Sequence, residues 1–373
     1  MQIFKFEAAK EKLNQNFFNQ TELPDTISLD NKDYGVTYSL NQDLNDYISK
    51  LIKRTRSDYS AVVVIDNNTG EVLSLVDYNK AKDEYGRSLA VNSTSPAASL
   101  FKVITAADLL ENTNVTRDSL FSYNGRASTL YKSQLEQKNT RWTRTLSFER
   151  AFAYSNNVIF GKAALQNLEP LSLIKMADKF GFNRPILDAI DVLPSQLFTV
   201  ETDYNLAELA SGFNRDTLIS PLHAATMATI IANDGIYKKP VLVKELVDKE
   251  HEKVVWRPEI LRERVLSDSA NKEMRLMMQG TVKRGTATGA FRQLPQRIAS
   301  QLEIGGKTGT ITGGIPFGKR DWFIAYATPH QPAEDKGISV GVMIVNLKKW
   351  HVKSTYLAKE IIQYYYNGHL QNK

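Results

Sequence analysis

The fold of this sequence is decided by the stretch Ser95-Pro96-Ala97-Ala98-Ser99-Leu100-Phe101-Lys102, which a largely apolar run over residues 103–110 follows. Pro96 is typical of the entry to a helix, so the pattern predicts a helix that begins at Ser99 and carries Lys102 one turn later on the same face. A lysine amine can take the proton of a serine hydroxyl if burial and neighbouring cations lower its pKa. Ser99 is therefore a candidate nucleophile and Lys102 a candidate base, although the same spacing is common at ordinary helix starts.

A second candidate motif is Ser155-Asn156-Asn157, within a segment of helical pattern. A second hydroxyl can relay a proton between Lys102 and a leaving group. The amide of Asn157 offers a donor and an acceptor, and it can hold both Lys102 and a substrate carbonyl. Taken alone, this triplet is equally typical of a turn or a helix cap.

A third motif, Lys307-Thr308-Gly309-Thr310, lies inside a predicted strand over residues 303–312. Glycine is unusual in a strand interior and often marks a close approach of a ligand or of another backbone. Lysine and threonine side chains at such an edge can bind a carboxylate. The backbone N–H of Thr310 can join that of Ser99 as an oxyanion hole. We expect Lys307 to stay charged and to help keep Lys102 neutral.

The three motifs together resemble the signature of penicillin-binding proteins and class A β-lactamases. Further stretches are similar to penicillin-binding protein transpeptidase domains: residues 38–42, 64–71, 208–212, 220–223, 233–240, 280–287 and 321–323. The resemblance covers residue 35 to the end and is greatest to the transpeptidase domains of bifunctional class A proteins. About 35 leading residues are too few for the glycosyltransferase domain of those proteins, so we expect that domain to be absent.

The resemblance implies a role for each motif residue. Ser99 is the nucleophile, Lys102 its base, Ser155 the proton relay and Asn157 the positioning amide. The substrate carboxylate is held by Lys307, Thr308, Gly309 and Thr310. The implied activity is that of a serine D,D-transpeptidase, which cross-links peptidoglycan stem peptides ending in D-Ala-D-Ala through an acyl-enzyme and is inhibited covalently by β-lactams.

Other functions of the same fold remain open at this point. A D,D-carboxypeptidase passes the acyl group to water instead of an amine. A serine β-lactamase needs a deacylating base, for which the nearest candidate is Glu201 in Glu201-Thr202-Asp203-Tyr204-Asn205. A non-catalytic β-lactam sensor or scaffold would also retain the fold.

Hydrophobic periodicity predicts the fold class. We expect an amphipathic helix over residues 41–55, two strands over 61–65 and 71–78, and a helical block over about 99–232. Next we expect a hairpin over 236–257 and a helix near 267–280. The last elements are three strands, over 303–312, 321–327 and 338–345, and a helix over 354–366. Sequential strands with short connections pair antiparallel. We therefore predict an α+β domain: a five-stranded antiparallel sheet flanked by the terminal helices, with an inserted helical subdomain. The resemblance implies that this fold is β-lactamase/transpeptidase-like. The domain would span residues 35–373, after an N-terminal extension over 1–34 that acts as a packing arm.

Composition excludes several alternatives. There is no cysteine, which removes disulfides, thiolate metal sites and cysteine nucleophiles. The five histidines lack metal-ligand spacing, and no cofactor motif is present, so we expect neither a metal nor a cofactor. The formal net charge of +6 suits an anionic surface such as a cell wall, and no dense Lys/Arg block suggests nucleic acid. Lys319 and Arg320 follow the Lys307 strand, where they could face an anionic substrate.

The implied location is periplasmic or otherwise extracytoplasmic, because cross-linkable stems occur only outside the cytoplasmic membrane. The sequence contains no run of about 18 apolar residues and no visible signal peptide. We therefore expect an export segment or membrane anchor upstream of Met1 or on a partner. The implied partners are stem peptides, β-lactams, and a separate glycosyltransferase or cell-wall assembly protein.

Overall fold

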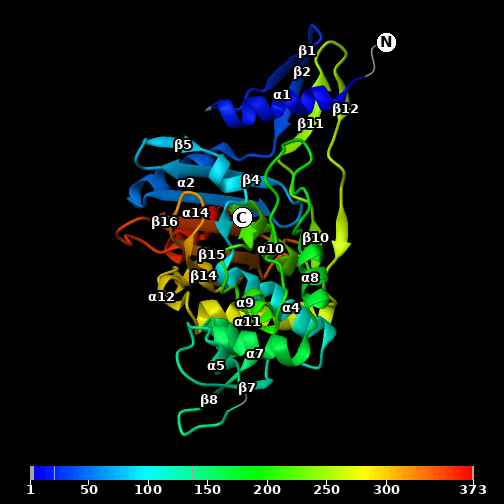
Figure 1. Cartoon of the computed structure of the whole chain (residues 1–373). Helices are drawn as coiled ribbons and strands as arrows, with labels where there is room; N and C mark the ends of the chain where they lie inside the picture. Colours follow the sequence, from blue (N-terminus) through cyan, green and yellow to red (C-terminus); the bar gives the residue numbers. More distant parts are fainter. Residues whose placement is uncertain (1–3, 21, 137, 372–373) are drawn as a thin grey trace.

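The computed structural model describes residues 4–20, 22–136 and 138–371, and a six-stranded antiparallel sheet forms its centre (Figure 1). In spatial order the strands are β14 (Leu302–Gly313), β15 (Gly318–Pro329), β16 (Ile338–Asn346), β3 (Tyr59–Asp66), β4 (Val72–Asn79) and β5 (Glu84–Gly86). All five predicted strands are present. The sixth, β5, has three residues and a mostly exposed surface, so it lacks the apolar pattern that reveals a strand in the sequence.

Both faces of the sheet are buried along its central strands, which explains why β16 and β3 are apolar almost throughout. Along β3, Val62 and Val64 pack with the helices α2 (Gln42–Arg54) and α14 (Ser354–Gln371). The alternate residues Val63 and Ile65 belong to a second core on the opposite face. Side chains of a strand point to alternate faces, so this double core requires covering elements on both sides. The predicted flanking of the sheet by the two terminal helices is confirmed.

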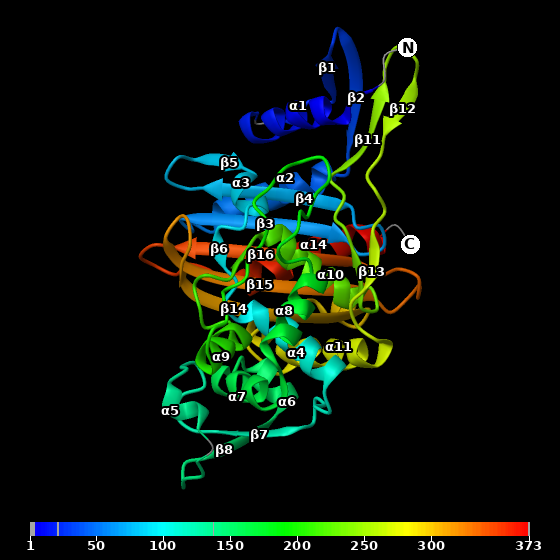
Figure 2. The ribbon, with the colours of Figure 1, turned by 45° about the vertical axis from the view of Figure 1, so that its right-hand side comes forward.

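The second face carries the inserted subdomain, which is mostly helical (Figure 2). Its elements include η1 (Ala98–Phe101), α4 (Lys102–Asn112), α6 (Phe148–Ala153), α7 (Asn157–Asn167), α8 (Pro170–Lys179), α9 (Asp203–Ser211) and α10 (Pro221–Ala232). Helix α11 (Asp268–Lys283) packs against both α6 and strand β14. The subdomain also contains a hairpin of β7 (Leu120–Tyr123) and β8 (Arg144–Ser147), which the helical periodicity did not predict because both strands are short and largely solvent-accessible.

A separate four-stranded sheet lies at the end of the molecule opposite the β7–β8 hairpin (Figures 1 and 2). Its order is β1 (Thr26–Leu29), β2 (Lys32–Tyr38), β11 (Val243–Asp248) and β12 (Lys253–Trp256). Helix α1 (Phe6–Asn19) packs beside it. Strand β2 crosses the predicted boundary at residue 34, so the N-terminal segment shares this sheet with the β11–β12 hairpin; the division into an extension and a domain stays a prediction. The first part of the predicted 236–257 hairpin, β10 (Ile236–Lys238), pairs instead with β13 (Arg262–Arg264).

Candidate active site

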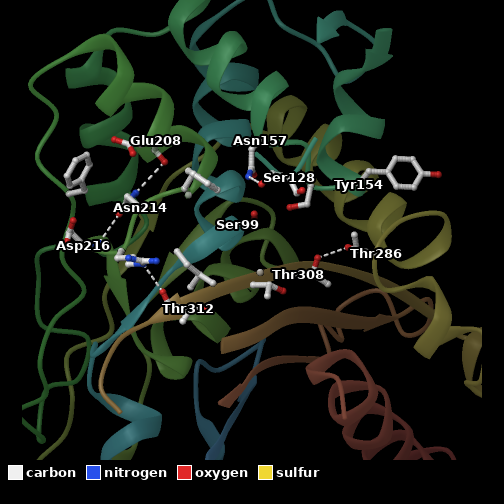
Figure 3. A pocket seen from close by; sticks show the side chains of 18 residues that line it. Ser99, Ser128, Tyr154, Asn157, Glu208, Asn214, Asp216, Thr286, Thr308 and Thr312 are labelled. Atoms are coloured by element: carbon white, nitrogen blue, oxygen red, sulfur yellow. Dashed lines mark hydrogen bonds between the residues drawn. The ribbon is translucent and has the colours of Figure 1, made fainter. Parts of the chain in front are cut away.

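A cleft of about 750 Å³ opens where strand β14 meets the helical subdomain (Figure 3). It is lined by Ser99, Ser128, Tyr154, Ser155, Asn157, Phe198, Glu208, residues 212–216, Thr286 and residues 308–312. The lining therefore includes members of all three sequence motifs. Sites at the junction of two structural units are common places for substrate clefts.

The first motif is assembled around a fully buried lysine. Lys102 begins α4, and Ser99 lies in the 3₁₀ turn just before it, so the predicted helix begins one turn later than expected. Lys102 Nζ lies 2.8 Å from Ser99 Oγ and 2.7 Å from Asn157 Oδ1, and it donates to the carbonyl of Ser211. The first two motifs thus meet at one amine, as the sequence predicted.

The contacts of Lys102 match a neutral amine. The Ser211 carbonyl can only accept hydrogen bonds, and Asn157 presents its carbonyl oxygen because its amide nitrogen donates to the carbonyl of Ser128. A neutral amine has two protons for these two acceptors, which leaves its lone pair for the Ser99 hydroxyl. Burial, with the charge of Lys307 as a second cause, lowers the pKa of Lys102 well below that of a free lysine. Lys102 is therefore suited to take the proton of Ser99 near neutral pH.

The second and third motifs meet at Lys307. Its Nζ donates to Ser155 Oγ and to the carbonyl of Thr308, each at 2.8 Å. The side chain is fully buried, and this burial lowers the pKa of Lys307 to about 7. The expectation that Lys307 stays charged therefore remains a prediction: no carboxylate pairs with Lys307 among the described residues, so its burial favours the neutral amine.

We expect the rate of acylation by a β-lactam to depend on pH in a bell shape. On the acidic side the rate rises as Lys102 loses its proton and becomes able to accept one from Ser99. On the alkaline side it falls as Lys307, whose pKa is about 7, loses the charge that attracts a substrate carboxylate. Stopped-flow acylation from about pH 5 to about pH 10 measures both limbs, and a flat profile would contradict the roles of both lysines.

Two residues next to the reacting groups adopt left-handed backbone conformations. Ala98, immediately before Ser99, has φ of 51°, and Ser155 has φ of 58°. Such conformations are costly for residues other than glycine and often occur at functional sites. The turn at Ala98 also requires Gly212, because a Cβ at that position would lie 1.9 Å from the Ala98 carbonyl oxygen.

Strand β15 anchors the segment that precedes the serine. Arg320 is fully buried; its Nε donates to Ser95 Oγ at 2.8 Å, and its other nitrogens donate to carbonyls of the β14–β15 turn. The Trp322 indole donates to the Pro96 carbonyl at 3.0 Å. The expectation that Arg320 faces an anionic substrate is therefore wrong: the strand alternation turns it inward, and it positions Ser95. Lys319 instead lies over the ring of Trp350.

Helix α6 contacts the segment that follows α11 closely beside this cleft, at Gly285. A Cβ on Gly285 would lie 2.3 Å from the carbonyl oxygen of Ala153, which is the residue before Tyr154 and Ser155. Next to it, the backbone N–H of Thr286 donates to the same carbonyl, and Thr286 Oγ1 lies 2.6 Å from Thr308 Oγ1. A side chain at residue 285 must therefore separate α6 from the chain that follows α11.

We expect Gly285→Ala to destabilise the protein by about 1–3 kcal/mol through overpacking and to slow acylation as the Thr286–Thr308 contact shifts. Gly289→Ala is the matched control, since nothing lies within 4 Å of its Cβ position. Urea unfolding and fluorescent-penicillin labelling measure the two effects. Equal stability of the two variants would contradict the tight contact.

The structure adds cleft residues that carried no catalytic signal in the sequence: Ser128, Tyr154, Phe198, Arg215, Asp216 and Thr286. Thr286 lies in the stretch 280–287 that resembles the family, and the other five belong to no recognisable motif, so the three-dimensional arrangement reveals them. Glu208 lies in a stretch noted for its resemblance, and its carboxylate accepts a hydrogen bond from Asn205. Glu201, the candidate deacylating base, is exposed and is not among the residues that line the cleft.

Comparison with known proteins places the chain in one protein family. Residues 60–363 match the penicillin binding protein transpeptidase domain, so the chain belongs to that family. Among solved structures, penicillin-binding protein 3 of Mycobacterium tuberculosis is similar with a TM-score of 0.74 and 20% identity, over 92% of this chain and 82% of that chain. The predicted β-lactamase/transpeptidase-like fold is confirmed.

Two curated relatives are similar to this chain in sequence. The chain is 27% identical to peptidoglycan D,D-transpeptidase PbpA of Mycolicibacterium smegmatis over 323 residues. This alignment covers 76% of this chain and 61% of PbpA. The chain is 25% identical to stage V sporulation protein D of Bacillus subtilis over 313 residues. This alignment covers 78% of this chain and 46% of that protein. The chain therefore spans about half to three fifths of the length of these relatives.

Proposed function

We propose that this chain is a serine D,D-transpeptidase domain that cross-links peptidoglycan stem peptides. The observation that carries the proposal is the contact of half-buried Ser99 with buried Lys102, which is joined through Asn157 to the second motif and lies in one cleft with the Lys307 strand. Membership of the penicillin binding protein transpeptidase family and similarity to a peptidoglycan D,D-transpeptidase support it.

The first half-reaction acylates Ser99. Its hydroxyl oxygen attacks the carbonyl carbon of the penultimate D-alanine while neutral Lys102 takes the hydroxyl proton. The oxyanion that forms is held by the backbone N–H groups of Ser99 and Thr310. The terminal carboxylate lies against Lys307 and Thr308, and Ser155 passes a proton to the departing amine of D-alanine.

The second half-reaction transfers the acyl group to an amine of another stem. The amine nitrogen bonds to the acyl carbon, the ester bond to Ser99 breaks, and the amine proton returns to the serine oxygen through Ser155 and Lys102. A carboxypeptidase would use water in place of the amine. Fast deacylation of a β-lactam would need a further base, and the exposed position of Glu201 outside the cleft disfavours it for that role.

Intact mass spectrometry after benzylpenicillin treatment tests the proposal. A transpeptidase should gain the mass of one intact benzylpenicillin and retain it for many minutes, because Glu201, the candidate deacylating base, lies outside the cleft. Rapid loss of the adduct with production of penicilloate would indicate a β-lactamase. Absence of any adduct would refute the serine acyltransferase assignment.

We also propose that the protein acts outside the cytoplasmic membrane, where its substrate occurs, with glycan strands supplied by a separate glycosyltransferase. Across the described ranges, no helix has the length and apolar character required to cross a bilayer. Fractionation of the native host tests the location, and a full-length product confined to the cytosol would contradict the transpeptidase proposal.

A further inference from the structure

A second cavity, of about 340 Å³, adjoins the catalytic cleft. It is lined by Ser147, Glu149, Arg150, Ala153, Tyr154 and Arg284, so Tyr154 forms a wall of both cavities. In Figure 3, Tyr154 lies beyond Thr286 and Thr308, at the end of the cleft opposite Glu208 and Asp216. The second cavity thus lies at this end of the cleft, with Tyr154 between the two.

The second cavity carries a net positive charge. The carboxylate of Glu149 is nearly buried, with one oxygen paired to Arg284 and the other 3.5 Å from Arg117. Arg150 is exposed, and its guanidinium has no ion-pair or hydrogen-bond partner within the part of the chain that the structure describes. The side chain of Arg284 is 63% exposed although it is paired. The single acid is therefore already neutralised, and the cationic groups remain accessible to an anionic ligand.

The second cavity lies on the side of the cleft toward which the amine of D-alanine leaves in the proposed reaction. In the proposed reaction the terminal carboxylate of D-alanine lies against Thr308, whose hydroxyl lies 2.6 Å from that of Thr286. Thr286 lines the cleft and is two residues after Arg284, which lines the second cavity. Attack by the acceptor amine is the reverse of departure of the D-alanine amine, so both nitrogens must occupy the same position. The acceptor therefore has to enter from this end of the cleft, past Tyr154.

We propose that the second cavity binds the acceptor stem peptide, with the peptide's carboxylates on Arg150 and Arg284. The inference rests on the proposed transpeptidase function and identifies where its second substrate lies. A stem peptide suits the site because it combines a primary amine, which must reach the acyl carbon, with free carboxylates that an exposed guanidinium can bind in a bidentate geometry. The donor stem then occupies the opposite end of the cleft, beside Arg215.

The experiment measures how the acyl-enzyme divides between amine and water. Wild type and Arg150→Glu are given a donor peptide ending in D-Ala-D-Ala and an acceptor peptide with a free side-chain amine, and both products are quantified by mass spectrometry. We expect Arg150→Glu to lower the ratio of cross-linked to hydrolysed product about five- to tenfold, with acylation by benzylpenicillin unchanged. An acceptor with amidated carboxylates should be a poorer substrate of wild type and should show no further loss with Arg150→Glu.

Arg292→Glu is the matched control, since it makes the same charge change at an exposed position that lines neither cavity. It should leave the ratio at the wild-type value. An unchanged ratio in Arg150→Glu, or an equal loss with the amidated acceptor, overturns the acceptor site while leaving the transpeptidase proposal intact. Failure of wild type to form any acyl-enzyme overturns the transpeptidase proposal itself, so the two failures are distinguishable.

Discussion

Ser99→Ala should abolish covalent labelling by benzylpenicillin and leave the fold intact. The hydroxyl of Ser99 is the nucleophilic atom of the proposed reaction, and no other hydroxyl of the described cleft lies within hydrogen-bond distance of Lys102. Removal of one partly exposed hydroxyl takes little packing from the structure, so the free energy of unfolding should change by about 1 kcal/mol or less. Labelling with a fluorescent penicillin and a urea unfolding curve measure the two quantities.

Ser128→Ala is the control for this result. Ser128 lines the same cleft, but its contact with Asn157 is made by its backbone carbonyl, which the substitution leaves in place. This variant should still be labelled at Ser99, and peptide mapping should locate the adduct there. An adduct on any other residue of the wild-type protein would contradict the assignment of the nucleophile.

Lys102→Met should slow acylation by about 10²–10⁴-fold, the range that loss of a positioned base typically produces. Methionine has a similar length and tolerates the buried position, but it cannot accept the proton of Ser99. The acceptors on Asn157 and Ser211 lose their donor, so we also expect a stability loss of about 1–3 kcal/mol.

The matched comparison is Lys307→Met, which removes the other buried amine of the cleft. Lys307 contacts Ser155 and not Ser99, so its loss should weaken substrate binding more than it slows the transfer of the serine proton. Rates of acylation at saturating and at low penicillin concentration separate these effects. Retention of more than about a tenth of the wild-type saturating rate by Lys102→Met would exclude Lys102 as the base.

Local patterns were sufficient to predict the core of the site. The three-residue spacing of Ser99 and Lys102 positions both side chains on one helical turn, and the structure joins them. The strand over 338–345 carries the apolar run that a buried sheet requires. Asn157 was predicted to contact Lys102 from its motif, and its amide oxygen does so.

Features that depend on distant pairing could not be predicted in this way. Strand β2 pairs with β11, about two hundred residues later, and neither sequence indicates the other. Arg320 looks like a solvated charge in the sequence, because nothing local reveals that it is surrounded by Ser95 and the carbonyls of its own turn. The second cavity joins Arg150 to Arg284 across the contact of α6 with α11, so its charge appears only after folding.

The anchoring of Ser95 and Pro96 by Arg320 and Trp322 has a consequence for the order of synthesis. The indole of Trp322 and the carbonyl that it binds are separated by 226 residues in the chain. A ribosome therefore completes the serine segment long before it makes the strand that holds this segment in place. Until β15 has been made and has joined the sheet, a growing chain contains Ser99 without the hydrogen bonds that Arg320 and Trp322 donate to the segment before it. Incomplete chains that stall before residue 318 should accordingly be unreactive toward a β-lactam, because reaction at Ser99 requires that the chain has been made at least through β15.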